Sequence, residues 1–278
     1  MNTNVPVDQY AVVGYPVKHS RSPFIHNLFA QQTGQRLQYG LLEVAPEHLN
    51  EKVTQFFSEG GKGLNITVPH KQSIMGLLSS CSPRATFAGA VNTVIKLPNG
   101  MLRGDNTDGI GLLHDLQQNL GCDLKQKRIL MLGAGGAARG VIAPLLEQEP
   151  EALVIANRTI ERAAQLASEF AHLGNIVAEP FNKLPHSPFD LIINATSASL
   201  QGEVPPLPTA SIDSNTLCYD MAYGKQETAF TRWAKEHGAT QAVKGWGMLV
   251  EQAAEAFFLW RGIRPNTEPV LSALLSAE

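Results

Sequence analysis

The feature that most constrains the fold is a glycine-rich segment that directly follows an apolar run. Ile129–Leu132 leads into Gly-Ala-Gly-Gly-Ala-Ala at residues 133–138. The pattern G-x-G-x-x-A between a strand and a helix is typical of dinucleotide-binding domains, because Gly133 permits the tight turn and Gly135 lets backbone amides approach a pyrophosphate. Ala138 is small enough for the helix to pack closely on the strand. The pattern alone is a weak signal, and a glycine turn that binds nothing is the alternative interpretation.

Apolar runs rich in branched residues alternate with amphipathic stretches along the chain. This alternation favours parallel α/β sheets. Residues 91–97 and 101–104, on either side of Pro98-Asn99-Gly100, are typical of a hairpin. The other expected strands are 10–14, 37–44, 63–68, 128–132, 153–157, 175–178, 191–195 and 217–221, and the expected helices are 22–34, 46–59, 108–120, 136–147 and 160–170.

Length and composition narrow the class of protein. The 278 residues suffice for two domains, and 44% hydrophobic with 17% charged residues predicts a folded chain. The net charge of -3 disfavours nucleic-acid binding. No uncharged apolar run reaches the roughly 18 residues of a membrane helix, and the amino terminus has no features of a secretory signal. Three scattered cysteines suggest reduced thiols in a cytoplasm, and the histidine spacing indicates no metal site.

The end of the second strand of this series indicates which dinucleotide is bound. NAD sites place Asp or Glu there to hold the ribose 2′-hydroxyl. This chain has Asn157, Arg158 and Thr159, followed by Arg162. A guanidinium can form a forked contact with a 2′-phosphate, which an acid would repel. The sequence therefore favours NADP, and a solvated surface arginine is the alternative.

Four segments in the first half combine polar side chains with apolar strands. They contain Ser20 with Ser22 at a helix entrance, the run Asn65–Lys71, Asn92, and Asp108 at a helix start. Hydroxyls and free amides at a helix entrance suit a carboxylate. Each segment taken alone also has a simpler interpretation: Ser22 as an N-cap, Lys71 as a surface lysine, and the amides and acids as turn formers.

Taken together, these motifs resemble the shikimate dehydrogenase family, and the resemblance covers nearly the whole chain. The motifs occur in the family's order, which is far more specific than any one of them. They are residues 14–27 (GYPVKHSRSPFIHN), 65–71 (NITVPHK), 89–93 (GAVNT), 106–109 (NTDG), 133–138, 157–159, 194–197 (NATS), 219–223 (YDMAY) and 245–253 (GWGMLVEQA).

The resemblance implies a role for each site residue. Ser20 and Ser22 would hold a substrate carboxylate, and Lys71 and Asp108 would be catalytic. Substrate hydroxyls would contact Thr67, Asn92, Asp108 and Gln252, with Asn65 in support and Tyr223 at the junction with the cofactor. The cofactor would contact Gly133, Ala134, Gly135, Gly136, Ala137, Asn157, Arg158, Thr159, Arg162, Thr196 with the neighbouring backbone of Ser197, Met221 and Gly245. No metal is implied.

The resemblance also implies two α/β domains with the active site in the cleft between them. Residues 1–107 and 243–278 would form the substrate-binding domain, and residues 108–242 a Rossmann-like NADP domain. The implied reaction is the reversible NADPH-dependent reduction of 3-dehydroshikimate to shikimate, in the pathway to chorismate and the aromatic amino acids. Hydrophobic periodicity by itself does not show the chain returning to the first domain.

Alternatives and departures remain. One alternative is a quinate/shikimate dehydrogenase with broader substrate or NAD use, and another is a non-catalytic NADP-sensing module. We expect a small-molecule substrate, no nucleic-acid or membrane partner and a cytoplasmic location, and leave a homodimer open. Ser199, Lys225 and Lys244 stand where the family often has glycine, proline, and Asp or Asn. Lys244 is close enough to the expected cleft to put substrate affinity in doubt.

Overall fold

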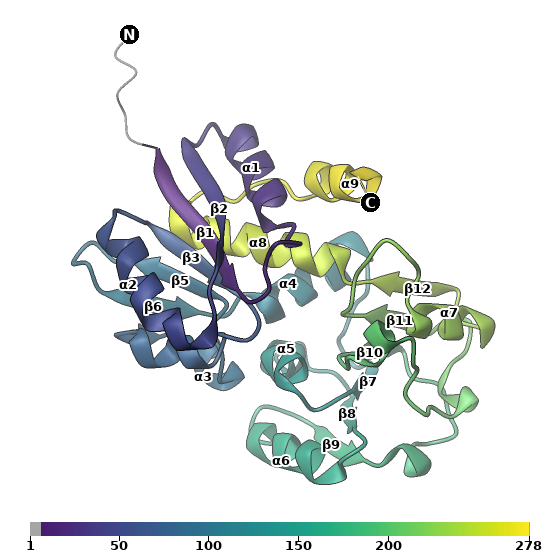
Figure 1. Ribbon diagram of the computed structural model, residues 1–278. Helices are drawn as coiled ribbons and strands as arrows, with labels where there is room; N and C mark the ends of the chain where they lie inside the picture. Colours follow the sequence, from purple (N-terminus) through teal and green to yellow (C-terminus); the bar gives the residue numbers. More distant parts are fainter. Residues whose placement is uncertain (1–6, 278) are drawn as a thin grey trace. The chain divides into compact units, whose positions relative to one another are not determined.

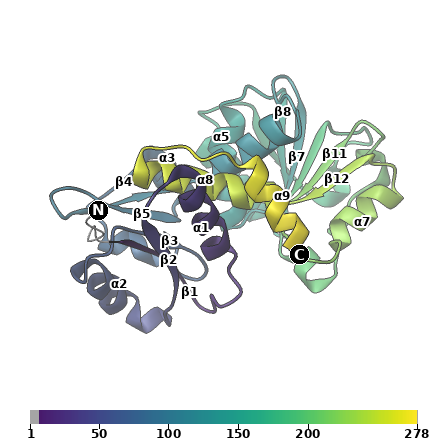
Figure 2. The same cartoon turned by 90° about the horizontal axis from the view of Figure 1, so that it is seen from above.

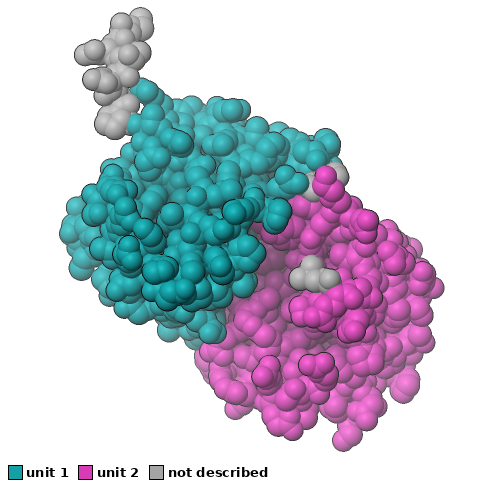
Figure 3. Space-filling view, in the orientation of Figure 1, with its two compact units in different colours: residues 1–111, 250–277 teal, residues 112–249, 278 magenta. Residues whose placement is uncertain are grey.

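The computed structural model describes residues 7–277 and divides into two compact units. Among the described residues, unit 1 comprises 7–111 and 250–277, and unit 2 comprises 112–249 (Figure 3). Figure 1 shows the helices and strands of both. The divisions fall inside two helices, α4 (Asp108–His114) and α8 (Trp246–Arg261). The chain thus leaves unit 1 within α4 and returns to it within α8.

Unit 1 is built on a mixed sheet of six strands in the order β2-β1-β3-β5-β6-β4. β1 pairs in parallel with β2 and β3, whereas β5 is antiparallel to both β3 and β6. The hairpin expected between residues 91 and 104 is confirmed as β5 and β6. The strands are β1 (Asp8–Gly14), β2 (Leu37–Glu43), β3 (Gly63–Ile66), β4 (Ser80–Cys81), β5 (Thr93–Lys96) and β6 (Leu102–Asp105).

Both faces of this sheet are packed, which explains why every residue of β1 from Tyr10 to Gly14 is buried. Ala11 and Val13 lie in one core cluster with α2 (Leu49–Ser58), while Tyr10 and Val12 lie in another with Tyr39. The other helices of the unit are α1 (Ser22–Thr33), α3 (Pro83–Ala88) and α9 (Glu268–Ala277), with short 3-10 turns at Pro46–His48 and Ser73–Leu77. α9 packs beside α1 (Figure 2).

Unit 2 contains a fully parallel sheet of six strands in the order β12-β11-β10-β7-β8-β9. Strand order therefore reverses between β7 and β10, as in the doubly wound dinucleotide-binding fold, whose ligands lie at that reversal. The strands are β7 (Arg128–Leu132), β8 (Ala152–Ala156), β9 (Ile176–Glu179), β10 (Leu191–Asn194), β11 (Leu217–Asp220) and β12 (Gln241–Lys244).

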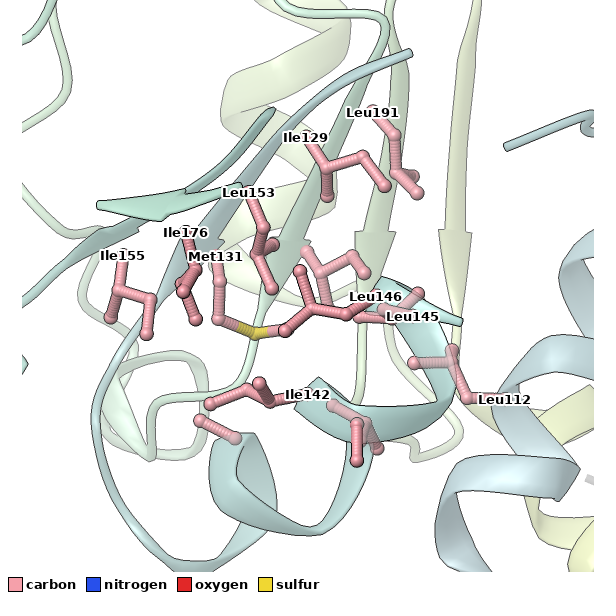
Figure 4. Close-up of a cluster of buried hydrophobic side chains, with 14 of the residues drawn as sticks. Leu112, Ile129, Met131, Ile142, Leu145, Leu146, Leu153, Ile155, Ile176 and Leu191 are labelled. Atoms are coloured by element: carbon pink, nitrogen blue, oxygen red, sulfur yellow. The ribbon is translucent and has the colours of Figure 1, made fainter. Parts of the chain in front are cut away.

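The central strands are almost entirely apolar because helices cover both faces. Ile129 and Met131 point into a cluster with Ile142, Leu145 and Leu146 of α5 (Gly136–Leu146), as Figure 4 shows. Residues of α6 (Ile160–Phe170) belong to the same cluster. Leu130 and Leu132 point to the opposite cluster, which contains Phe230 of α7 (Ala229–Glu236). Continuous apolar runs of this kind are expected for strands buried on both faces. Short 3-10 turns lie at Phe181–Lys183, Ala198–Gln201 and Thr209–Ser211.

The helix expected over residues 108–120 differs in its second half. α4 ends at His114, and Asp115–Asn119 forms a π-helical turn. The buried Asp115 carboxylate accepts a hydrogen bond of 2.6 Å from the Tyr219 hydroxyl. A Cβ on Gly247 would lie 1.8 Å from Asp115 Oδ1, so only glycine fits there. The π-helical turn thus begins at the residue that makes this buried polar contact.

No helix within residues 7–277 is long and apolar enough to cross a membrane. No group of three or more His, Cys, Asp or Glu side chains in the range could hold a metal ion.

Candidate functional site

A buried amide, Asn92, organises the polar cluster of unit 1. Its Nδ2 donates to Thr107 Oγ1 at 2.9 Å and to Asp108 Oδ1 at 2.8 Å. Its Oδ1 accepts from the backbone N of Thr107 and from the Thr93 hydroxyl, both at 2.9 Å. Because a buried amide is costly unless its donors and acceptors are satisfied, these bonds fix the side chain and the carboxylate that it contacts.

Asp108 is the first residue of α4, as the sequence predicts. Its backbone N donates to Asn106 Oδ1 at 3.0 Å, which orders the entry to the helix. A carboxylate at this position is stabilised by the helix N-terminus.

The same carboxylate is paired with Lys71. Lys71 Nζ lies 2.5 Å from Asp108 Oδ2, with side-chain exposures of 30% for the lysine and 18% for the aspartate. Both Asp108 oxygens are thus engaged, one by Lys71 and one by Asn92. An ammonium has three N–H donors, so Lys71 keeps two beyond the one that it directs to Asp108.

The backbone around Lys71 is held on both sides. The neighbouring His70 ring Nε2 lies 2.7 Å from the carbonyl oxygen of Val44, and the Lys71 carbonyl accepts from the Val91 N–H at 2.7 Å. The lysine therefore starts from a fixed point, which limits the positions that its ammonium can reach.

Gln252 brings α8 to this cluster. Its Oε1 lies 3.4 Å from both Asn92 Nδ2 and Thr107 Oγ1. The approach of α8 to α4 requires glycine at position 111, because a Cβ there would lie 2.7 Å from the Gln252 backbone N. The sequence offers no sign that Gly111 has this function.

Ser20 and Ser22 lie at the entrance of α1, but neither is the cap that simple helix rules suggest. Ser22 is the first helical residue, and the N-cap position is taken by Arg21, whose side chain makes no capping bond. Ser20 Oγ accepts from the backbone N of Ser22 at 3.3 Å. The interpretation of Ser22 as an N-cap is therefore wrong.

Tyr39 belongs to this region and was not predicted as a site residue. Its hydroxyl donates to Asn65 Oδ1 at 2.6 Å, while Asn65 Nδ2 donates to Asn92 O at 3.1 Å and to Thr93 Oγ1 at 3.2 Å. The Asn65 amide is thus satisfied by the protein itself. Burial raises the pKa of Tyr39 well above its usual value, and Ser22 beside it acts in the opposite direction.

The His26 ring packs against the rings of Tyr39 and Trp260. The two rings are stacked with centroids 4.2 Å apart, and Trp260 lies 5.4 Å from His26. Burial lowers the pKa of His26 to about 3, so the imidazole is neutral.

Thr67 is placed by a backbone bond of 2.9 Å from its N–H to Val13 O, and its methyl group occupies the space that a side chain at Gly14 would need.

In unit 2 the glycine loop has the shape expected for a pyrophosphate. Gly133 has a φ of 103°, which favours glycine. A Cβ on Gly135 or Gly136 would meet no atom within 4 Å, so the loop is open above these two residues. The N-terminus of α5 has no side-chain cap, which leaves backbone N–H groups directed at that space. Ala134 and Ala137 complete the loop.

Arg158 follows the end of β8 and is exposed. Asn157 Nδ2 donates to Thr159 O at 2.8 Å and so closes the turn that carries it. Arg139, in contrast, is paired with Glu169 and lies over the Phe170 ring. Arg162, in the first turn of α6, is also exposed.

Three loops meet at the carboxyl end of this sheet. The Met221 N–H donates to Asn194 O at 3.0 Å, and the Gly245 N–H donates to Ala222 O at 3.1 Å. A Cβ on Gly245 would lie 2.5 Å from Met221 O, so this approach also needs glycine. The residues expected near the nicotinamide, Met221 and Gly245, therefore lie together, and Thr196 bonds to Asn194 Oδ1 beside them.

Two further residues of this region have defined partners. Tyr223 is 43% exposed and packs on Trp246 with ring centroids 4.8 Å apart. Ser199 donates to Asp220 Oδ2 at 2.6 Å. Burial raises the pKa of Asp220, and the Ser199 hydroxyl is the first of several groups that oppose this shift.

The fold and these clusters define a two-domain α/β protein of the dinucleotide-binding class. Family descriptions match three parts of the chain: shikimate dehydrogenase substrate binding domain at residues 12–94, shikimate / quinate 5-dehydrogenase at 115–202, and shikimate 5′-dehydrogenase C-terminal domain at 245–275.

Individual relatives give the same result. The chain is 58% identical over 268 residues to a shikimate dehydrogenase (NADP(+)) of Aeromonas hydrophila, covering 96% of this chain and 97% of the relative. An Ael1 enzyme from Pseudomonas putida has a TM-score of 0.92 at 46% identity, covering 96% and 98%. Shikimate 5-dehydrogenase from Thermus thermophilus, in complex with NADP(H) and shikimate, has a TM-score of 0.87 at 34% identity, covering 98% and 100%. The chain belongs to the shikimate dehydrogenase family.

We expect Ser22→Ala to raise the Michaelis constant for shikimate with little loss of stability. Losing a hydrogen bond to a carboxylate costs about 1.5–3 kcal/mol, which corresponds to roughly 10–160-fold. No helix cap is lost, so the melting temperature should stay near that of the wild type. Steady-state kinetics and thermal unfolding of one preparation measure both effects.

Ser82→Ala is the matched control, since Ser82 does cap α3 through its bond with the Ala85 N–H. It should lower stability by about 1 kcal/mol or more and leave the Michaelis constant unchanged. A destabilised Ser22→Ala with normal kinetics would remove Ser22 from the site.

Proposed function

We propose that this protein is an NADP-dependent shikimate dehydrogenase that reversibly reduces 3-dehydroshikimate to shikimate. It is an oxidoreductase acting on a CH–OH group, in the pathway that leads to chorismate and the aromatic amino acids. The observation that carries the proposal is the Lys71–Asp108 ion pair in a chain of this family. In this proposal Lys71 is the proton donor, and Asp108, the first residue of α4, is the carboxylate that orients it.

Lys71 acts at the reacting oxygen. Bound NADPH supplies the hydride, and negative charge then grows on the ketone oxygen of the substrate. The ammonium stabilises that charge and donates a proton to it, and in the reverse direction the amine takes the proton from the alcohol. We assign the proton to Lys71 because its ammonium keeps two N–H donors beyond the one that it directs to Asp108.

Asp108 and Asn92 position the lysine. Asn92 holds one carboxylate oxygen of Asp108, and the other holds the ammonium. The remaining substrate contacts follow the family's pattern: Ser20 and Ser22 bind the carboxylate, and Thr67, Asn92, Asp108 and Gln252 bind hydroxyls. Asn65 supports this cluster, and Tyr223 lines the nicotinamide side.

The cofactor residues lie in unit 2. The amides of residues 133–137 hold the pyrophosphate, and Asn157, Arg158, Thr159 and Arg162 hold the 2′-phosphate end. Thr196, Met221 and Gly245 line the nicotinamide end. This division supports our proposal that unit 1 binds substrate and unit 2 binds NADP.

Two alternatives are separated by one assay, the reduction of NADP measured with shikimate and with quinate. A quinate/shikimate dehydrogenase would turn over both substrates at comparable efficiency. A non-catalytic NADP sensor would turn over neither, and the intact Lys71–Asp108–Asn92 arrangement argues against it. We expect turnover with shikimate and much less with quinate.

We also propose a cytoplasmic homodimer. The three cysteines are unpaired, as expected in a reducing compartment. β2 is an edge strand, paired only with β1, and Leu41 on it is 44% exposed. An open edge of this kind favours pairing with a second copy. Light scattering of the purified protein, with Leu41→Lys as the comparison, tests the dimer, and cell fractionation tests the location.

We expect Lys71→Met to lower turnover by at least about a hundredfold, since general acid–base help is worth about 10²–10⁴-fold. Methionine keeps much of the length and removes the charge and the protons. The Michaelis constant for shikimate should change far less, because the charge on oxygen is largest in the transition state. Steady-state kinetics measure both constants.

Asp108→Asn should also lose activity, and the double variant should lose less than the product of the single effects, because the pair works as a unit. Lys62→Met, which removes an exposed lysine of unit 1, is the control and should behave as wild type. If Lys71→Met turns over normally and only binds shikimate more weakly, the assignment of the proton to Lys71 is wrong.

Arg158→Leu should weaken NADP binding by about tenfold or more and leave NAD binding nearly unchanged, because it removes a charge-assisted phosphate contact of about 1.5–3 kcal/mol. Calorimetry with each cofactor measures the two affinities. Arg36→Leu removes an exposed arginine of unit 1 and serves as the control. Equal losses for NADP and NAD would show that Arg158 supports the fold instead.

A further inference from the structure

The loop between β11 and α7, residues 221–228, carries Met221 and Tyr223 and contains no helix or strand. Its two ends are anchored. The Ala222 N–H donates to Asp220 Oδ1 at 3.1 Å, and the Thr228 side chain caps α7 by accepting from the Thr231 N–H. The middle of the loop lies between these anchors and includes the flexible residue Gly224.

The side chain of Lys244 reaches this middle part from the end of β12. Lys244 Nζ lies 2.5 Å from Gly224 O, 3.4 Å from Lys225 O and 3.2 Å from Gln226 O. Three consecutive main-chain oxygens therefore converge on one ammonium. Figures 1 and 2 show the elements involved, β11, β12 and α7, side by side at one end of the sheet of unit 2.

Such a convergence needs a cation. Carbonyl oxygens carry partial negative charge and repel one another when they point to one spot, and a cation placed there turns that repulsion into attraction. The ammonium has three donors, and three acceptors face it. The N–H donors of Lys244 are therefore directed to the carbonyl oxygens of this loop.

We propose that Lys244 is a positioning residue that holds the loop of residues 221–228 in the conformation that presents Tyr223 and Met221 to the nicotinamide end of the site. This role rests on the proposed function. Lys244 contacts neither substrate nor cofactor in this account, and it acts through the main chain of residues 224–226. The backbone bond from Gly245 to Ala222 joins the residue after Lys244 to the same loop.

Lys244→Met tests the role, because methionine keeps much of the side chain and removes the cation. We expect kcat/KM for shikimate to fall about tenfold, as for a lost charge-assisted bond. Binding of 2′-phospho-ADP-ribose, which lacks nicotinamide, should stay within about twofold of wild type, because its contacts lie at residues 133–137 and 157–162. Lys244→Arg should recover much of the activity.

A second measurement does not depend on the reaction. Trypsin cleaves after Lys225, inside the loop, and mass spectrometry of the native protein follows the fragment ending at that residue. Lys244→Met should be cut there at least about five times faster than wild type, and Lys244→Arg at an intermediate rate. If the wild type were inactive on shikimate, the proposed function would be wrong. The cleavage rate at Lys225 would still show whether Lys244 holds residues 224–226 in place.

Lys125→Met is the matched control, since Lys125 is an exposed lysine of unit 2 paired with Glu149 at 2.8 Å. It should change neither kinetics nor cleavage at Lys225. Wild-type kcat/KM and cleavage in Lys244→Met would overturn the proposal. So would an equal loss of 2′-phospho-ADP-ribose binding, which would show that Lys244 supports the whole unit.

Discussion

The buried amide of Asn92 is the interaction on which the polar cluster of unit 1 depends. Its oxygen accepts from Thr93 and Thr107, and its nitrogen donates to Thr107 and Asp108. A group that must satisfy all these bonds away from water has one stable orientation. That orientation fixes Asp108, and Asp108 in turn fixes the ammonium of Lys71. The chemistry thus starts from a constraint imposed by burial.

In unit 2 the corresponding constraint is geometric. Parallel strands end at the same edge of a sheet, so the loops after β7, β10, β11 and β12 meet there. Glycine at positions 133 and 245 allows these backbones to approach each other, and side chains would keep them apart. Hydrogen bonds from Met221 to Asn194 and from Gly245 to Ala222 then join the loops into one surface.

Much of this could be predicted from the sequence, because alternating apolar residues and a glycine loop are local signals. The two sheets, the hairpin of β5 and β6 and the start of α4 at Asp108 are confirmed. The roles of the site residues came from the resemblance and stay predictions. Tyr39 was missed because its bond to Asn65 joins strands that are far apart in sequence, and alternation shows that a residue is buried but not what it contacts. The hydrogen bonds from Lys244 to the carbonyl oxygens of residues 224–226 have no local sequence signal either.

The route of the chain has a consequence for the order in which the protein can be completed. Unit 1 needs residues 250–277, which are synthesised after residues 112–249 of unit 2. Gln252 reaches Asn92 and Thr107, Glu255 accepts from Arg84, and Trp260 donates to Val94 O, so these late residues contact elements made much earlier. During synthesis from the N-terminus, unit 2 is therefore complete while the first unit still waits for its closing helix. In a nascent chain the dinucleotide-binding unit is therefore complete before the polar cluster of unit 1. A chain whose synthesis stops before residue 252 lacks Gln252.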